Sequence, residues 1–221
     1  VVDVACGTGN TSLAAARAGA EVTGVDLTPK MLEGARAAAA REGVTGCTFL
    51  EGDAQALPLP DDTFDVALST FGCMFAPDQA RTAAELTRVV RPGGRIGVTG
   101  WIPDGGPGAF LRLLSSFFPP PPAGAGMPLA WGDEDHVRAL FAQAAPGSQA
   151  SMSRLRVSVV FDSVDDAVTT YTSQFGLLVL ARPALEEAGM WDALVEALRE
   201  FFSAMPASRS GGVLMDSDYL Q

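Results

Sequence analysis

The sequence predicts an α/β fold built on a doubly wound, mostly parallel sheet. Short β-branched and apolar runs alternate with helical segments over residues 1–101, and this alternation is typical of parallel strands joined by helical crossovers. A glycine-rich turn follows the first run, and an acidic residue lies at the end of the second and third. Because ligands of open parallel sheets bind at the carboxyl ends of strands, these turns indicate where function lies.

The elements of this first part follow from apolar patterning and turn residues. Thr28 is placed to cap the second helix, with Pro29 at its first position. The expected strands are 1–5, 21–25, 47–50, 64–69 and 94–101, and the expected helices are 11–18, one that starts at 29, and 77–90.

The pattern loosens beyond Trp101. Four prolines at 119–122 exclude one continuous helix there, so we expect 102–132 to be an active-site cover or a plain connector. We expect a single domain over 1–221, with a cofactor-binding core at 1–101 and lid or acceptor segments at 102–132 and 162–212. The expected elements are helices at 110–118 and 133–144, a strand at 155–161, and mostly helix over 165–205, interrupted near Arg182-Pro183 and at Gly189.

Composition excludes several classes of partner and site. The net charge of −11 would repel a phosphate backbone, so no nucleic-acid partner is expected. The apolar runs fall far short of the ~20 residues that span a bilayer, and no signal peptide is evident, so we expect a cytoplasmic protein without a membrane span. Cys6, Cys47 and Cys73 show no CxxC spacing, which predicts no disulfide framework and no metal site. Oligomeric state is not readable.

The strand ends carry groups that suit a nucleoside-containing cofactor. The turn Gly7-Thr8-Gly9 lets the backbone approach a ligand, and the helix start behind it offers N–H groups to a carboxylate. The spacing in sequence between this turn and Asp26 suits a carboxylate that accepts hydrogen bonds from both hydroxyls of a ribose. Asp53 can accept an adenine amino proton while the N–H of Ala54 meets a ring nitrogen.

A nicotinamide-binding protein would share the glycine turn and the acid on the second strand. Its fingerprint prefers Gly or Ala where this chain has Ser12. Asp3 also departs from that fingerprint, because a carboxylate inside the first strand needs a partner such as a ligand ammonium or backbone donors. An NAD-dependent oxidoreductase is therefore the weaker alternative.

Five segments together resemble the class I S-adenosylmethionine-dependent methyltransferases, with similarity to the ubiquinone and menaquinone biosynthesis branch. These are 3–9 (DVACGTG), 24–27 (GVDL), 52–60 (GDAQALPLP), 64–67 (FDVA) and 91–95 (RPGGR), so the resemblance covers roughly 1–101. It implies S-adenosyl-L-methionine as cofactor and a sheet of order 3-2-1-4-5-7-6 with the last strand antiparallel.

The resemblance also implies which residues hold the cofactor. Asp3, Ala5, Cys6, Gly7, Thr8 and Gly9 would lie at its methionine end, Asp26 at the ribose, Asp53 and Ala54 at the adenine, Leu27 and Met31 near the adenosine, and Thr70 beside the cofactor after the fourth strand. As an alternative, Cys6 is a small buried spacer and Thr70 is ordinary strand-end packing.

The expected activity is methyl transfer to an oxygen, nitrogen or carbon nucleophile on a small, rather apolar molecule by in-line displacement. No metal is required, and no catalytic residue can be named; His136 is a weak candidate for a base. The aromatic residues Trp101, Phe110, Phe117, Phe118 and Trp131 would line an acceptor pocket or belong to the core. A noncatalytic sensor or partner subunit that binds the cofactor is the alternative.

The ends of the sequence predict a fragment of a longer protein. Val1 already lies in the first strand, and Ser217–Gln221 resembles a strand just beginning. Without that last strand, 155–161 would lack a neighbour and leave backbone groups unpaired.

Overall fold

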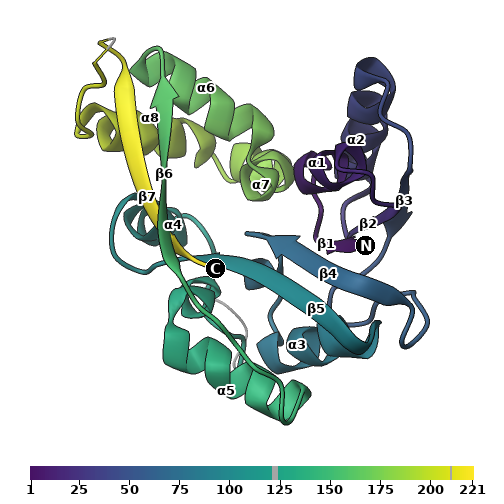
Figure 1. Ribbon diagram of the computed structural model, residues 1–221. Coiled ribbons are helices and arrows are strands. Elements are labelled where there is room, and N and C mark those ends of the chain that lie inside the picture. The colour runs from purple at the N-terminus through teal and green to yellow at the C-terminus, as the bar shows by residue number, and fades with distance from the viewer. Residues whose placement is uncertain (121–123, 210) are drawn as a thin grey trace. The chain divides into compact units, whose positions relative to one another are not determined.

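The chain folds into two compact units, which the computed structural model describes over residues 1–120, 124–209 and 211–221 (Figure 1). The first unit holds Val1–Trp101, the described part of Pro122–Arg154, and Leu220–Gln221. The second holds the described parts of Ile102–Pro121 and Leu155–Tyr219. The proline run expected at 119–122 lies partly outside the described residues.

Five parallel strands form the sheet of the first unit. β1 pairs with β2 and β4, β2 with β3, and β4 with β5, all in parallel. The β-branched side chains of Val2, Val4 and Val25 are fully buried, which favours extended backbone packed on both faces. The strands are β1 (Val2–Val4), β2 (Val22–Asp26), β3 (Cys47–Glu51), β4 (Phe64–Thr70) and β5 (Val90–Trp101).

Helices cover both faces of these strands. Figure 1 shows α1 and α2 on one side and α3 and α5 on the other, as a doubly wound fold requires. The elements are α1 (Asn10–Arg17), α2 (Pro29–Glu42), α3 (Gln79–Arg88) and α5 (Glu134–Ala144), with short 3₁₀ helices η1 (Cys73–Phe75) and η2 (Pro128–Gly132).

The start of β5 differs from the prediction. The expected helix at 77–90 ends at Arg88, and Val90 already pairs with Phe64 before the register shifts to Val66 opposite Arg95. Gly93 takes a left-handed φ of 79° in the intervening bulge, a backbone conformation that glycine adopts at little cost. Gly93 and Gly94 thus lie inside a longer strand instead of marking the place where the strand begins.

The second unit is a helical cluster around an aromatic and aliphatic core. The largest part of that core comes from Phe110, Phe161, Leu178, Leu198 and Phe202. Its helices are α4 (Gly106–Ser115), α6 (Val164–Gln174), α7 (Gly176–Glu187) and α8 (Trp191–Ser203).

Two helix boundaries in this unit were predicted wrongly. α4 begins four residues before the expected 110, because Gly105, with a positive φ of 98°, takes the N-cap position and Pro107 fits the first turn. The break expected near Arg182-Pro183 is absent, since Pro183 lies inside α7 while Leu178 and Leu185 on either side of it are buried. The chain breaks instead at Phe175, whose extended backbone separates α6 from α7.

The last two strands are antiparallel. Ser153 and Gln221 exchange backbone hydrogen bonds of 2.9 Å in both directions, and Arg156 contacts Asp218 further along. Residue numbers therefore run in opposite directions along β6 (Arg154–Phe161) and β7 (Val213–Leu220). The sheet order is β3-β2-β1-β4-β5-β7-β6, which confirms the predicted order.

β7 begins earlier than the sequence indicated. It was expected only from 217, but it starts at Val213 and gives β6 a hydrogen-bonded neighbour. Val213, Met215 and Ser217 are buried, and Asp216 and Asp218 alternate with them. The period of two was not evident in the sequence, because the apolar Leu214 lies on the more open face and the polar Ser217 lies on the buried face. Among the described residues, no helix has the length and apolar character needed to cross a membrane.

Candidate functional site

The turn after β1 has the backbone conformation of a ligand-binding loop. Ala5, Gly7 and Gly9 have φ angles of 55°, 56° and 83°, in the left-handed region. Gly9 is the N-cap of α1 and has no side chain to cap this helix. The backbone N–H of Ser12, in the first turn of α1, is bonded to the carboxylate of Asp3, and N–H groups at such a helix start suit an anionic group.

Asp26 is connected to this turn by hydrogen bonds. Its Oδ2 accepts the backbone N–H of Gly7 at 2.8 Å, and its Oδ1 accepts the N–H of Thr28 at 2.9 Å. A carboxylate has about four acceptor positions, so two backbone donors leave capacity for two hydroxyl groups. Thr28 occupies the N-cap of α2 as predicted, but its side chain makes no capping bond.

Asp3 lies beneath the turn rather than on its surface. Its side chain is 1% exposed, and the Oγ of Ser12 donates a 2.6 Å hydrogen bond to Oδ2. Burial raises the pKa of Asp3 to about 6, against the lowering effect of the Ser12 hydrogen bonds. The carboxylate therefore ties β1 to α1, and its contact with the methionine end stays a prediction.

Phe49 on β3 supports the same turn from the interior. A Cβ at Gly24 would lie 2.7 Å from its ring, and a Cβ at Gly9 would lie 3.2 Å from it. Cys6 also packs here, 3.0 Å from the Gly24 position. The ring of Phe49 thus occupies the space that side chains at both glycines would need.

Asp53 is held by a residue that the sequence reasoning missed. Gln55 donates its backbone N–H to Oδ1 of Asp53 at 2.8 Å and its side-chain amide to both oxygens at 3.1 Å. The Oε1 of Gln55 in turn accepts the N–H of Asp78. Only the local Asp-x-Gln spacing could have suggested the first of these bonds.

Thr70, Leu27, Met31, Thr8 and Ala54 complete the predicted set. Thr70 accepts a 2.9 Å hydrogen bond from the Oγ1 of Thr11 at the start of α1, which brings the end of β4 to the turn. Leu27 is 66% exposed beside Asp26, and Met31 and Ala54 are half-buried. Thr8 packs against Gly34 of α2. The structure thus brings the residues after β1 and β2 together with the end of β4, and sets Asp53 and Ala54 after β3.

The thiols are not reactive nucleophiles. Burial raises the pKa of Cys6 well above its usual range, and burial raises that of Cys73 to about 12. Both are therefore protonated at neutral pH, as expected of small apolar spacers. Within the described ranges, no group of three or more His, Cys, Asp or Glu side chains is arranged to hold a metal ion.

The aromatic residues expected to line an acceptor pocket or to belong to the core differ in how deeply they are buried. Phe110 belongs to the core of the second unit with Phe117 and Phe118 packed against it, whereas Trp131 is 2% exposed beside Phe141 in the first unit. Trp101 is half-buried at the end of β5. Core packing thus accounts for Phe110 and Trp131, and Trp101 remains at the carboxyl edge.

His136 has a local structural partner. Its Nε2 lies 2.6 Å from Oε1 of Gln79, whose own amide donates to the carbonyl of Met127. The Nε2 of His136 is then the donor, which leaves Nδ1 as its acceptor.

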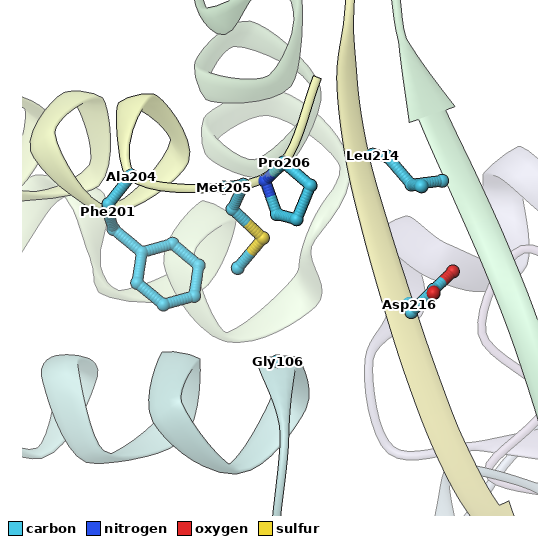
Figure 2. A pocket seen from close by; sticks show the side chains of 7 residues that line it. All are labelled: Gly106, Phe201, Ala204, Met205, Pro206, Leu214 and Asp216. Carbon is cyan, nitrogen blue, oxygen red and sulfur yellow. The ribbon is translucent and has the colours of Figure 1, made fainter. Parts of the chain in front are cut away.

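The second unit contains a cavity of about 370 Å³ (Figure 2). Figure 2 shows Phe201 and Met205 on one side of β7, with the side chains of Leu214 and Asp216 directed away from them. None of the predicted cofactor residues lines it. The lining residues are Gly106, Phe201, Ala204, Met205, Pro206, Leu214 and Asp216.

Residues 2–98 match the family described as a methyltransferase domain. An uncharacterized protein of Mycobacterium tuberculosis is 48% identical over 141 residues, which is 64% of this chain and 51% of the relative. A demethylmenaquinone methyltransferase of Thermus thermophilus is 39% identical over 127 residues, 57% of this chain and 50% of the relative. The chain spans about half the length of these curated relatives.

A solved structure shares the fold over almost the whole chain. The YcgJ protein from Bacillus subtilis aligns with a TM-score of 0.60 over 99% of this chain and 89% of its own, at 19% identity. At this identity the likeness concerns the fold alone.

Proposed function

We propose that this protein is a class I S-adenosylmethionine-dependent methyltransferase that transfers the methyl group of S-adenosylmethionine to a small, rather apolar acceptor; the match of residues 2–98 to a methyltransferase domain and the sheet order support this. One observation carries the proposal. The carboxylate of Asp26, at the end of β2, is hydrogen-bonded to the glycine turn after β1 and still has acceptor positions for two ribose hydroxyls.

The other groups fit the parts of the same cofactor. The N–H groups at the start of α1 suit the methionine carboxylate, and Leu27 offers an exposed apolar side chain to the adenosine beside Asp26. Asp53, oriented by Gln55, is placed to accept from the adenine amino group, with Ala54 next to it. We assign the rest of the predicted set to the same site, around the turn and the strand ends: Asp3, Ala5, Cys6, Thr8, Met31 and Thr70.

The proposed mechanism is direct displacement in line with the methyl–sulfur bond. The cofactor supplies an activated methyl group, so the protein's task is to position the acceptor and exclude water. Such positioning can contribute roughly 7 to 11 kcal/mol to lowering a barrier. The buried thiol of Cys6 is protonated and His136 is bonded through Nε2 to Gln79, so we assign no general base and expect an acceptor that is already nucleophilic.

The acceptor class is drawn from charge and from relatives. The net charge of −11 disfavours nucleic acid as a substrate. A relative at 39% identity is named a demethylmenaquinone methyltransferase, so demethylmenaquinone belongs in the acceptor panel together with simpler phenols, amines and thiols.

The test is calorimetry followed by a turnover screen. S-adenosylhomocysteine should bind the full chain, and NAD should not compete with it. Formation of S-adenosylhomocysteine from S-adenosylmethionine with a member of the panel would support catalysis. Tight cofactor binding without product from any acceptor would favour a noncatalytic binding subunit, and tighter binding of NAD would overturn the cofactor assignment.

A further inference from the structure

The carboxylate of Asp53 is tied to the turn that follows β3. Its Oδ1 accepts the backbone N–H of Gln55 at 2.8 Å, and the carbonyl of Asp53 accepts the N–H of Ala56 at 2.9 Å. Asp53 and Gln55 are both half-buried. The N–H groups of Gln55 and Ala56 are used within the turn itself, so neither is available to the ring nitrogen that we assign to Ala54.

A backbone group on another element sets which end of the Gln55 amide faces Asp53. Oε1 of Gln55 accepts the N–H of Asp78, the N-cap of α3, at 2.8 Å. A backbone N–H can only donate, so the atom opposite it must be the amide oxygen. The amide nitrogen Nε2 is then directed at Asp53, 3.1 Å from both Oδ1 and Oδ2. Towards Asp53, the side chain of Gln55 is therefore a donor and not an acceptor.

The backbone of this loop is anchored separately from the amide. Nε of Arg81 donates to the backbone carbonyl of Gln55 at 2.8 Å, and Oε2 of Glu85 accepts the N–H of Leu57 at 2.7 Å. Arg81 and Glu85 both lie on α3. Because these bonds do not involve the amide of Gln55, the anchoring of the loop and the orientation of Asp53 can be separated by mutation.

We propose that Gln55 is a positioning residue that selects adenine as the base of the cofactor, because it holds the carboxylate of Asp53 as an acceptor for the 6-amino group. This inference rests on the proposed function, since it concerns the nucleobase of the same cofactor. Within the described contacts, Oδ1 of Asp53 accepts two bonds from Gln55 and Oδ2 accepts one. A carboxylate oxygen has about two acceptor positions, so Oδ2 keeps one for an N–H of the base.

Gln55 acts through Asp53 by reducing what this carboxylate loses when a base binds. An aspartate without such donors rotates about its side-chain bonds, and ordering it against a base costs conformational entropy. The bonds from Gln55 impose the orientation before the cofactor arrives. An ionised carboxylate held in this way offers only acceptors, so a purine without an amino group at position 6 gains no hydrogen bond from Asp53.

The experiment compares S-adenosylhomocysteine with the analogue whose purine lacks the 6-amino group, by calorimetry on the full chain. The analogue keeps the ring nitrogen assigned to Ala54, so the ratio of the two affinities reports the contact of Asp53. We expect the wild-type protein to prefer S-adenosylhomocysteine by roughly tenfold. Gln55→Met has a similar length but no amide, and it should reduce this preference severalfold while it leaves the affinity for the analogue unchanged.

A double-mutant cycle separates positioning from a structural role. Asp53→Ala should remove the preference, and adding Gln55→Met should then change neither affinity. Arg81→Met is the matched control, because it removes an anchor of the loop and leaves the amide; it should keep the full preference even if it lowers the unfolding midpoint. An unchanged preference in Gln55→Met, or an equal loss in Arg81→Met, would overturn the inference.

The same measurements test the proposed function separately. Gln55→Ala should lose the preference as Gln55→Met does, and it replaces that variant if Gln55→Met does not fold. A wild-type chain that binds both compounds equally well would refute the selection of adenine through Gln55 and leave the cofactor assignment standing. A wild-type chain that does not bind S-adenosylhomocysteine would refute the proposed function itself.

Discussion

The carboxylate of Asp26 accepts backbone hydrogen bonds from Gly7 and Thr28. Replacing it by alanine removes these bonds together with the proposed charge-assisted bonds to the ribose. We expect Asp26→Ala to weaken S-adenosylhomocysteine binding by roughly 1.5 to 3 kcal/mol, measured by calorimetry. Asp192→Ala, an exposed acid on α8, controls for net charge and should bind normally. Equal affinities of Asp26→Ala and wild type would refute the ribose assignment.

Asp3 should make stability depend on pH. Its pKa is raised from 3.8 to about 6 by burial, so the folded state holds this proton more tightly than the unfolded chain. The stability that the protonated form contributes is present below about pH 4 and is lost as pH rises through about 6. Asp3→Asn cannot ionise and should escape this loss.

The measurement is urea unfolding of wild type and Asp3→Asn at pH 4 and pH 7.5. The advantage of Asp3→Asn over wild type should be about 2.4 kcal/mol larger at the higher pH. Fixed costs of the substitution cancel in this comparison. A difference that does not change with pH would mean that the buried carboxylate is not destabilised in the folded protein.

Sequence reasoning proposed Asp26 and Asp53 because each follows a strand at a position that suits contacts with a nucleoside, and their contacts with the cofactor stay a prediction. It missed Gln55, whose contact with Asp78 joins positions on two different elements. It also left Phe71 unremarked, since neither a left-handed φ nor a ring stack with Trp101 is visible before β4 and β5 are aligned. Local spacing suggests candidate ligand-binding groups, and only tertiary contacts show which residues orient their side chains.

Helix α7 contains a proline that removes one of its backbone hydrogen bonds. Pro183 is exposed within the helix and has no N–H to donate to the carbonyl of Val179. Alanine would restore that bond. It would also raise the conformational entropy of the unfolded chain, which opposes part of the gain. We expect Pro183→Ala to raise the free energy of unfolding by about 1 to 2 kcal/mol in urea titrations. Pro60→Ala, in an exposed turn, is the matched control and should bring no gain; a destabilised Pro183→Ala protein would contradict this account.

Element types were predicted better than element boundaries. The break at Phe175 was missed because the cause is tertiary: its ring packs edge-on against Phe110, which no periodicity in 165–205 reveals. The early start of β5 was missed because a bulge at Gly93 lies inside a strand. Proline and glycine indicate where a backbone can deviate, and packing decides whether it does.

At the scale of the whole molecule, we keep the proposal that segments 102–132 and 162–212 cover the acceptor. Such covers order when both ligands bind. Hydrogen exchange in the described parts of 102–132 should slow on adding S-adenosylhomocysteine with an active acceptor, whereas α5 should not change. Equal exchange with and without ligands would identify the segment as a static connector.

The sheet order of the whole molecule came from resemblance and not from periodicity. Alternating segments predict parallel strands and crossovers, but they do not say that β7 lies between β5 and β6. The family likeness of 1–101 supplied that order. The composition, by contrast, constrained only partners, because net charge acts on association and not on topology.

The packing of Phe49 against Gly9 and Gly24 has a consequence for how this sequence can evolve. A methyl group at Gly24 would collide with the ring of Phe49, so Gly24→Ala is not tolerated while Phe49 remains. A smaller residue at position 49 removes the contacts with the ring, so that only the Sγ of Cys6, at 3.0 Å, would still have to shift, but it leaves a void until position 24 fills it. The two sites are therefore epistatic, and the order in which their substitutions arise decides which lineages keep the turn that we propose binds the cofactor.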